Sequence, residues 1–168
     1  MSDTARTAPA TSSAHVVDVD GEALAVAPEA GQLAGWVRHA LEGVEQACEV
    51  GVQVVSEATI QALNAQYRQR PTPTNVLSFP AQVPAPLEVH PLGDIVVCAD
   101  VVAREAREGQ IDEQSHWAHM MIHGTLHLLG YDHEVDADAE VMESRERSLM
   151  RAAGFADPYA FVDADEET

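Results

Sequence analysis

Three histidines near the end of one apolar segment constrain this chain most strongly. His123 and His127 are four residues apart, and His133 follows six residues later. In a helix, residues four apart project from the same face, so two imidazoles can reach one metal ion. Gly130 is the residue type that ends helices in a left-handed conformation, which lets the chain turn back. The spacing therefore predicts a metal site built from three histidines at the end of a helix.

The segment around the first two histidines is apolar on nearly every side. It contains Trp117, Met120, Met121, Ile122, Leu126, Leu128 and Leu129. Such a helix is expected to be buried, and buried imidazoles need hydrogen-bond partners or a metal to offset their desolvation. Three protein nitrogens leave one tetrahedral position open for water, as catalytic zinc sites do. We expect one zinc ion, although imidazole also suits nickel, copper and iron.

Two neighbouring residues are candidates to orient the metal ligands through hydrogen bonds. Asp132 directly precedes His133, and a turn residue without such a role is an equally good interpretation. His119 lies one helical turn before His123. The alternative for His119 is a polar residue that is satisfied in the core or lies at the mouth of a cleft.

The residue after the first histidine separates this pattern from that of the metzincin proteases, whose histidine and glycine spacing it shares. Those enzymes carry Glu at this position as the general base for the attacking water. Here the position is Gly124, which cannot accept a proton. Peptidase chemistry is therefore disfavoured. A zinc site can still act through bound hydroxide, because zinc lowers the pKa of its water to about 7.

Charge gives a second constraint. The 168 residues include 28 acidic residues against 9 basic residues, all of them Arg, for a formal net charge of −19. This balance argues against a protein that coats nucleic acid or an anionic membrane. Residues 58–87, however, contain no Asp or Glu and include Arg68 and Arg70. We interpret this acid-free window as a surface that faces a negatively charged substrate; a polar loop that lacks acids by chance is the alternative.

The order of strand-like and helix-like segments predicts an α+β domain with a mixed sheet of about four strands and packed helices. Ser56 is a candidate N-cap. Strands are expected near 16–20, 51–56, 75–79 and 93–98, and helices near 31–48, 57–67, 99–108, 112–129 and 136–152. We expect a disordered tail over 1–14, one domain over 15–159 and an acidic tail over 160–168.

The cellular compartment is predicted from what the sequence lacks. Cys48 and Cys98 are too few for a disulfide framework, and a buried thiol is the expected state of Cys98. No run of 18 apolar residues is present, and the first fourteen residues lack the apolar core of a secretory signal. A cytoplasmic protein without membrane contacts is expected.

The eleven residues from His123 to His133 resemble the signature of the YbeY family of endoribonucleases, which are bacterial ribosomal-RNA maturation factors. Other segments also resemble motifs of this family, and they follow in order along the chain. They are Leu63–Arg68, Thr74–Pro80, Leu92–Cys98 and Trp117–Met120. The resemblance implies a zincin-like α+β fold and one metal, expected to be zinc, on His123, His127 and His133.

The same resemblance implies a single-strand-specific, metal-dependent endoribonuclease that acts in 16S ribosomal RNA 3′-end maturation and in ribosome quality control. Its implied partners are ribosomal RNA, the small ribosomal subunit with its proteins, and an assembly GTPase. Two alternatives stay open. One is a metal-dependent hydrolase of another class, such as a peptidase, and the other is a ribosome-assembly factor with a structural metal.

Arg68 corresponds to the functional Arg of the family and is the expected catalytic contact to phosphate. The transition state of phosphodiester cleavage carries extra negative charge, which a guanidinium can stabilise. Arg70, Asn75 and Ser78 are further candidates for substrate binding. For Ser78, an ordinary strand residue is an equally good interpretation.

Overall fold

A four-stranded sheet forms the centre of the computed structural model, which describes residues 15–83, 87–132 and 134–160. The strands are β1 (Val16–Asp20), β2 (Cys48–Val55), β3 (Val76–Pro80) and β4 (His90–Cys98), in the spatial order β1-β2-β4-β3. Strand β2 pairs in parallel with β1 and β4, whereas β3 runs antiparallel to β4 and forms an edge of the sheet. The predicted α+β fold with a mixed four-stranded sheet is confirmed.

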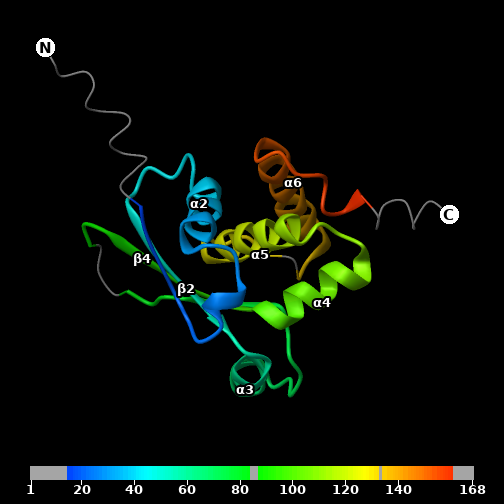
Figure 1. Ribbon diagram of the computed structural model, residues 1–168. Coiled ribbons are helices and arrows are strands. Elements are labelled where there is room, and N and C mark those ends of the chain that lie inside the picture. The colour runs from blue at the N-terminus through cyan, green and yellow to red at the C-terminus, as the bar shows by residue number, and fades with distance from the viewer. Residues whose placement is uncertain (1–14, 84–86, 133, 161–168) are drawn as a thin grey trace, which may run out of the picture.

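In the described ranges, five α-helices and one short 3-10 helix pack around the sheet. They are η1 (Leu24–Val26), α2 (Ala30–Ala40), α3 (Glu57–Arg68), α4 (Ala99–Gly109), α5 (Glu113–Leu128) and α6 (Asp136–Ala152). Figure 1 shows α2, α5 and α6 gathered on one side, with α3 standing apart from them at the bottom of the view. Helix α5 lies at the centre of the helical layer, so its residues are largely buried, as predicted.

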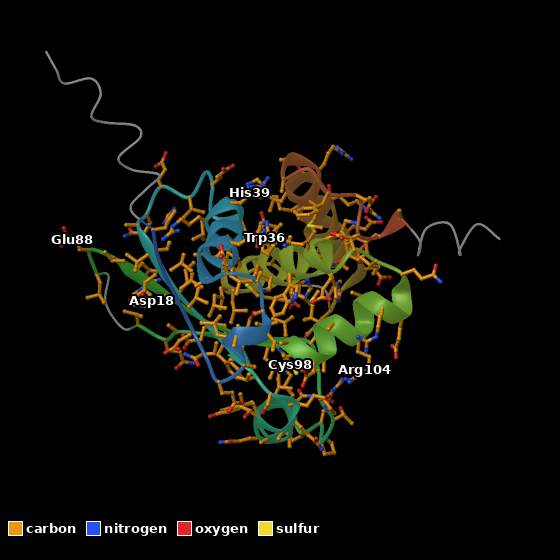
Figure 2. All side chains as sticks on the ribbon, viewed as in Figure 1. Asp18, Trp36, His39, Glu88, Cys98 and Arg104 are labelled. Carbon is orange, nitrogen blue, oxygen red and sulfur yellow. The ribbon has the colours of Figure 1, made fainter. Side chains whose placement is uncertain are left out.

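The two faces of the sheet have opposite character. Along β1, Val17 and Val19 pack on the main core, whereas Asp18 and Asp20 are exposed on the other face. Figure 2 labels Asp18 on this strand. The main core fills the space between the sheet and α2, α5 and α6. A smaller apolar cluster lies beneath α3 and consists of Val55, Ile60, Leu77, Val96, Cys98 and Val101.

Helices α2 and α6 are joined by specific contacts across the top of α5. The Nε2–H of His39 donates a hydrogen bond to the carbonyl oxygen of Leu149 at 2.8 Å. The ring of Trp36 meets Phe155 edge to face, with centroids 6.1 Å apart. Figure 2 labels Trp36 and His39 on α2. These contacts hold α6 in place above α5, which matters for the site described below.

Some element boundaries differ from the expectation. The helix expected over 31–48 ends at Ala40, and Gly43 then adopts a positive φ of 89°. Strand β2 begins three residues before its expected start, because Cys48 pairs with His90 in the parallel register. Helix α6 has its expected bounds of 136–152. The N-cap at Ser56 is confirmed, since its side chain accepts a hydrogen bond from the Thr59 N–H.

Both thiols are buried, as expected for Cys98, and burial raises the pKa of each. None of the helices in the described ranges combines the length and the apolar character that crossing a membrane requires.

Candidate active site

The end of α5 has the geometry that the sequence predicts for a turn after His127. Gly130 adopts a positive φ of 104°. The N–H of Tyr131 donates to the carbonyl oxygen of Leu126 at 3.0 Å, and the N–H of Gly130 donates to that of His127 at 3.0 Å. This is the Schellman arrangement, which satisfies the last carbonyl groups of a helix. His133 lies outside the described residues.

His123 and His127 lie side by side on α5, with ring centroids 4.6 Å apart. The Nδ1–H of His127 donates to the carbonyl oxygen of Tyr131 at 3.1 Å. The Nδ1–H of His123 donates to Oε2 of Glu146 at 2.7 Å. A carbonyl oxygen and a carboxylate oxygen can only accept, so these contacts place a proton on Nδ1, and in the neutral imidazole the lone pair is then on Nε2. A metal-ligating imidazole is usually held in this way, and the two rings therefore fit the expected metal.

Glu146 is a fully buried carboxylate, with 1% of its side chain exposed. Its Oε2 accepts hydrogen bonds from Nε2 of His119 at 2.9 Å and from Nδ1 of His123 at 2.7 Å. Its Oε1 accepts a hydrogen bond from the Tyr159 hydroxyl at 2.5 Å. Burial raises the pKa of Glu146, but the hydrogen bonds from His119 and His123 outweigh it and hold that pKa well below its usual range. The carboxylate therefore stays charged.

Donor atoms of His119, His123 and Glu146 also lie within 4.8 Å of one another, so these three residues could hold a metal ion. Two ligands of one tetrahedral zinc ion, at bonds of about 2.0–2.2 Å, lie about 3.3–3.6 Å apart. The two nitrogen–oxygen distances to Glu146, 2.9 and 2.7 Å, are those of hydrogen bonds. As arranged, Glu146 therefore accepts the imidazole protons and orients the His123 ring.

Glu146 and Tyr159 were not predicted from the sequence. Glu146 is one of many acidic residues in its segment, and no metal-ligand spacing marks it. A usable signal does exist, because its helical neighbours Met142, Leu149 and Met150 are apolar and buried. An acidic residue in the apolar stripe of a helix indicates a buried carboxylate with dedicated partners.

A small polar pocket of about 180 Å³ brings several of the predicted residues together. It is lined by Arg68, Thr74, Asn75, Val76, Ser78, His123 and His127. Arg68 is the last residue of α3, and the two histidines belong to α5. The start of β3 forms a further wall of the pocket. Within the described ranges, the Arg68 guanidinium has no acidic partner, so its positive charge is available to an anionic substrate.

Asn75 and Ser78 line the pocket, and both also hold β3 in place. Asn75 donates from Nδ2 to Glu105 at 3.0 Å and accepts at Oδ1 from the Val76 N–H at 2.6 Å. Ser78 donates from Oγ to the carbonyl oxygen of Gly124 at 3.0 Å. The Ser78 hydroxyl proton and one of the two Asn75 amide protons are therefore engaged within the protein, and a direct role in substrate binding stays a prediction.

The other predicted residues lie outside this pocket. Arg70 is exposed and does not line it. Asp132 lines a separate depression and accepts a hydrogen bond from the Glu134 N–H at 3.3 Å, a contact typical of a turn residue. His119 approaches the site through Glu146, which it shares with His123.

Gly124 has a packing role beside these histidines. A Cβ at this position would lie 3.0–3.3 Å from three side-chain carbons of Ile95, which is fully buried on β4. Because α5 approaches the sheet closely here, any side chain at this position requires Ile95 to shift. The missing general base of the metzincin pattern thus has a structural reason in addition to a chemical one.

The family model described as "Endoribonuclease YbeY" matches residues 22–154. The chain belongs to the YbeY endoribonuclease family. A curated relative, the endoribonuclease YbeY of Halorhodospira halophila (strain DSM 244 / SL1), is 51% identical over 138 residues, which cover 80% of this chain and 90% of the relative. The resemblance inferred from the motifs is confirmed.

Structural comparison agrees with this assignment. A solution structure of a protein from Thermotoga maritima is similar at 27% sequence identity with a TM-score of 0.55. The match covers 89% of this chain and 93% of that chain. The family match over residues 22–154 includes β2, β3, β4, all five α-helices and the residues of the polar pocket, rather than the histidine motif alone.

Proposed function

We propose that this YbeY-family protein is a metal-dependent endoribonuclease that cleaves single-stranded RNA. One structural observation supports the proposal independently of family membership. The same small pocket contains the Arg68 guanidinium and the side chains of His123 and His127. A phosphodiester needs both a cation at its oxygens and an activated nucleophile, and this pocket offers residues for each.

Each residue has a distinct part in this proposal. His123 and His127 would hold the metal through Nε2, together with His133. A bound zinc ion supplies a water of lowered pKa and a positive charge at the phosphate. The Glu146 carboxylate and the Tyr131 carbonyl fix the two rings by accepting their Nδ1 protons. Arg68 donates hydrogen bonds to the non-bridging phosphate oxygens.

The RNA in question is proposed to be the 3′ end of 16S ribosomal RNA, with a further role in ribosome quality control in the cytoplasm. The resemblance to the family supports this part of the proposal, as it does the small-subunit proteins and the assembly GTPase as partners. Incubation of the protein with small subunits that carry an extended 16S 3′ end tests it. Removal of the extension is expected, and an intact extension would contradict the assignment.

The cleavage test compares two arginines that lie close together in sequence but differently in space. Arg68 lines the pocket, whereas Arg70 does not. Arg68→Glu is expected to lower cleavage of a labelled single-stranded RNA by at least a hundredfold, with the fold and the metal content unchanged. Arg70→Glu is the matched control and should retain activity within about threefold, because an exposed rim charge contributes little. Equal losses in both variants would contradict the assignment of Arg68.

The metal test uses His127→Ala. Loss of a ligand is expected to remove the metal, as measured by elemental analysis of the purified protein, and to abolish cleavage. If the variant retains its metal, the assignment of the site is wrong. If the wild-type protein binds metal but cleaves no RNA, the alternative of an assembly factor with a structural metal is favoured. A peptidase is disfavoured by the packing of Gly124 against Ile95.

A further inference from the structure

Tyr67 is a large aromatic residue that stays 56% exposed at the end of α3. Its ring meets Phe79 of β3 edge to face, with centroids 5.2 Å apart and an angle of 72° between the planes. The two rings line a shallow groove of about 360 Å³. The remaining walls of the groove are Gln53, Leu63, Asp94 and Val96.

This groove lies next to the polar pocket, around the edge of the sheet. Tyr67 and Arg68 are consecutive on α3, and Phe79 and Ser78 are consecutive on β3. In each pair, one residue lines the groove and the other lines the pocket. Ser78 pairs with Ile95 on the face covered by α5, whereas Phe79 pairs with Asp94 on the opposite face. Strand β3 is an edge strand, so no further strand separates the two sites.

We infer that the Tyr67–Phe79 groove binds one nucleobase of the single-stranded RNA whose phosphate lies at Arg68. Bases of an unpaired strand are exposed, and proteins bind them by stacking on aromatic side chains. A duplex cannot offer an unstacked base at this position, which gives the proposed preference for single strands a physical basis. This inference rests on the proposed function.

Charge limits the subsite to one nucleotide. Asp94 belongs to both the groove and the acidic depression formed by Asp18, Asp20 and Glu49 on the outer face of the sheet. A further phosphate on that face would meet these carboxylates and be repelled. A neutral base beside Asp94 is not repelled, and its amino or imino hydrogens can donate to the carboxylate.

The test pairs a change in the protein with a change in the RNA. In one set of single-stranded oligonucleotides, each nucleotide in turn is replaced by an abasic nucleotide, and kcat/KM for cleavage is measured. For the wild-type protein, one abasic position next to the cleavage site is expected to lower kcat/KM about tenfold. Tyr67→Leu, which keeps an apolar side chain but removes the ring, is expected to lower kcat/KM for intact RNA by the same factor.

Combining Tyr67→Leu with the abasic RNA distinguishes a Tyr67 ring that stacks on a base from one that only packs α3 on the sheet. With Tyr67→Leu, the abasic position should cause no further loss, because the exposed Tyr67 ring on which the base stacks is absent. Tyr67→Phe should restore wild-type behaviour, and Gln66→Ala, at an exposed neighbour on α3, is the control. If the two losses multiply, Tyr67 only holds α3 on the sheet and the inference is overturned. If the wild-type protein cleaves no RNA at all, the proposed function itself has failed.

Discussion

At the scale of single residues, Glu146 is a charged side chain in the interior of the protein. A buried carboxylate is stable only when its charge is paired and its oxygens accept hydrogen bonds, and here three donors converge on it. Tyr159 stays a neutral donor, because burial and the charge of Glu146 raise the pKa of its hydroxyl far above the usual range. The arrangement joins α6 to the ligand face of α5.

The role of Glu146 can be measured through metal affinity. Glu146→Gln retains the size of the side chain but removes the charge that holds the His123 ring, so we expect metal affinity to fall about 10- to 100-fold. Titration of the apoprotein with zinc by calorimetry measures this change. Glu140→Gln, at an exposed position on the same helix, is the matched control and should bind zinc as tightly as the wild type. Unchanged affinity in Glu146→Gln would contradict the orienting role.

Two helical glycines give a matched test of packing. Alanine at Gly35 of α2 meets no atom within 4 Å, so Gly35→Ala should stabilise the protein by up to about 1 kcal/mol through helix propensity alone. At Gly124 the same change forces Ile95 to shift, which costs about 1–3 kcal/mol and offsets that gain. The free energy of unfolding, measured by urea denaturation, should therefore be higher for Gly35→Ala than for the wild type. It should be lower for Gly124→Ala than for Gly35→Ala. An equal gain at both sites would show that α5 is not tightly packed on β4.

At the scale of elements, one wall of the pocket depends on a polar junction between β3, α4 and α5. Glu105 on α4 accepts hydrogen bonds from Asn75 at the start of β3, at 3.0 Å, and from Nε2 of His116 on α5, at 2.9 Å. The hydrogen bond from His116 lowers the pKa of Glu105, burial opposes this effect, and the hydrogen bond from Asn75 adds to it. The junction therefore requires an ionised carboxylate.

This junction predicts a dependence of stability on pH. The unfolded chain protonates Glu105 near its ordinary pKa of 4.5, and the folded chain does so only at lower pH. The stabilisation is thus complete above pH 4.5 and declines as the pH falls through the folded pKa. The contribution of Glu105 to the free energy of unfolding is below about 1 kcal/mol, because its side chain is 39% exposed and solvent screens its charge. The difference in the free energy of unfolding between wild type and Glu105→Gln should shrink as the pH falls from 7 to 3. Glu108→Gln, at an exposed position of α4, is the matched control.

At the scale of the whole molecule, part of the acidic excess lies on a face of the sheet away from the polar pocket. The outer face of the sheet carries Asp18, Asp20, Glu49 and Asp94, and this face is opposite the one covered by α5. Residues 58–87, which supply Arg68 and β3, contain no acidic residue. The net charge of −19 therefore limits RNA binding to a small area around the pocket.

Salt dependence measures the size of that area. A protein that neutralises one or two phosphates of a single strand should show a slope of log K against log salt of about −1. Fluorescence anisotropy with a labelled single-stranded RNA, at several salt concentrations, gives this slope for the full chain. We expect weak binding at physiological salt. Tight binding with a slope near −5 would show that many phosphates are contacted and would contradict the small footprint.

Local patterns in the sequence were sufficient for several features. The spacing of His123, His127 and Gly130 predicted the paired rings and the left-handed helix end, because helical periodicity and a positive φ are properties of a few consecutive residues. The same reasoning predicted Ser56 as an N-cap, the bounds of α6 and the mixed sheet. The motifs that resemble the YbeY family were likewise readable without a structure.

Contacts between residues that are distant in sequence depend on how the helices and strands pack together. Glu146 reaches His123 because α6 packs across α5, and no local pattern encodes this contact over 23 residues. Tyr159, which follows α6, reaches the site by donating to Glu146. The start of β2 depends on its pairing with β4 in the same way. The structure also separated Arg68, which lines the pocket, from Arg70, which does not. The sequence thus determined the chemical groups, and long-range packing determined which of them form one site.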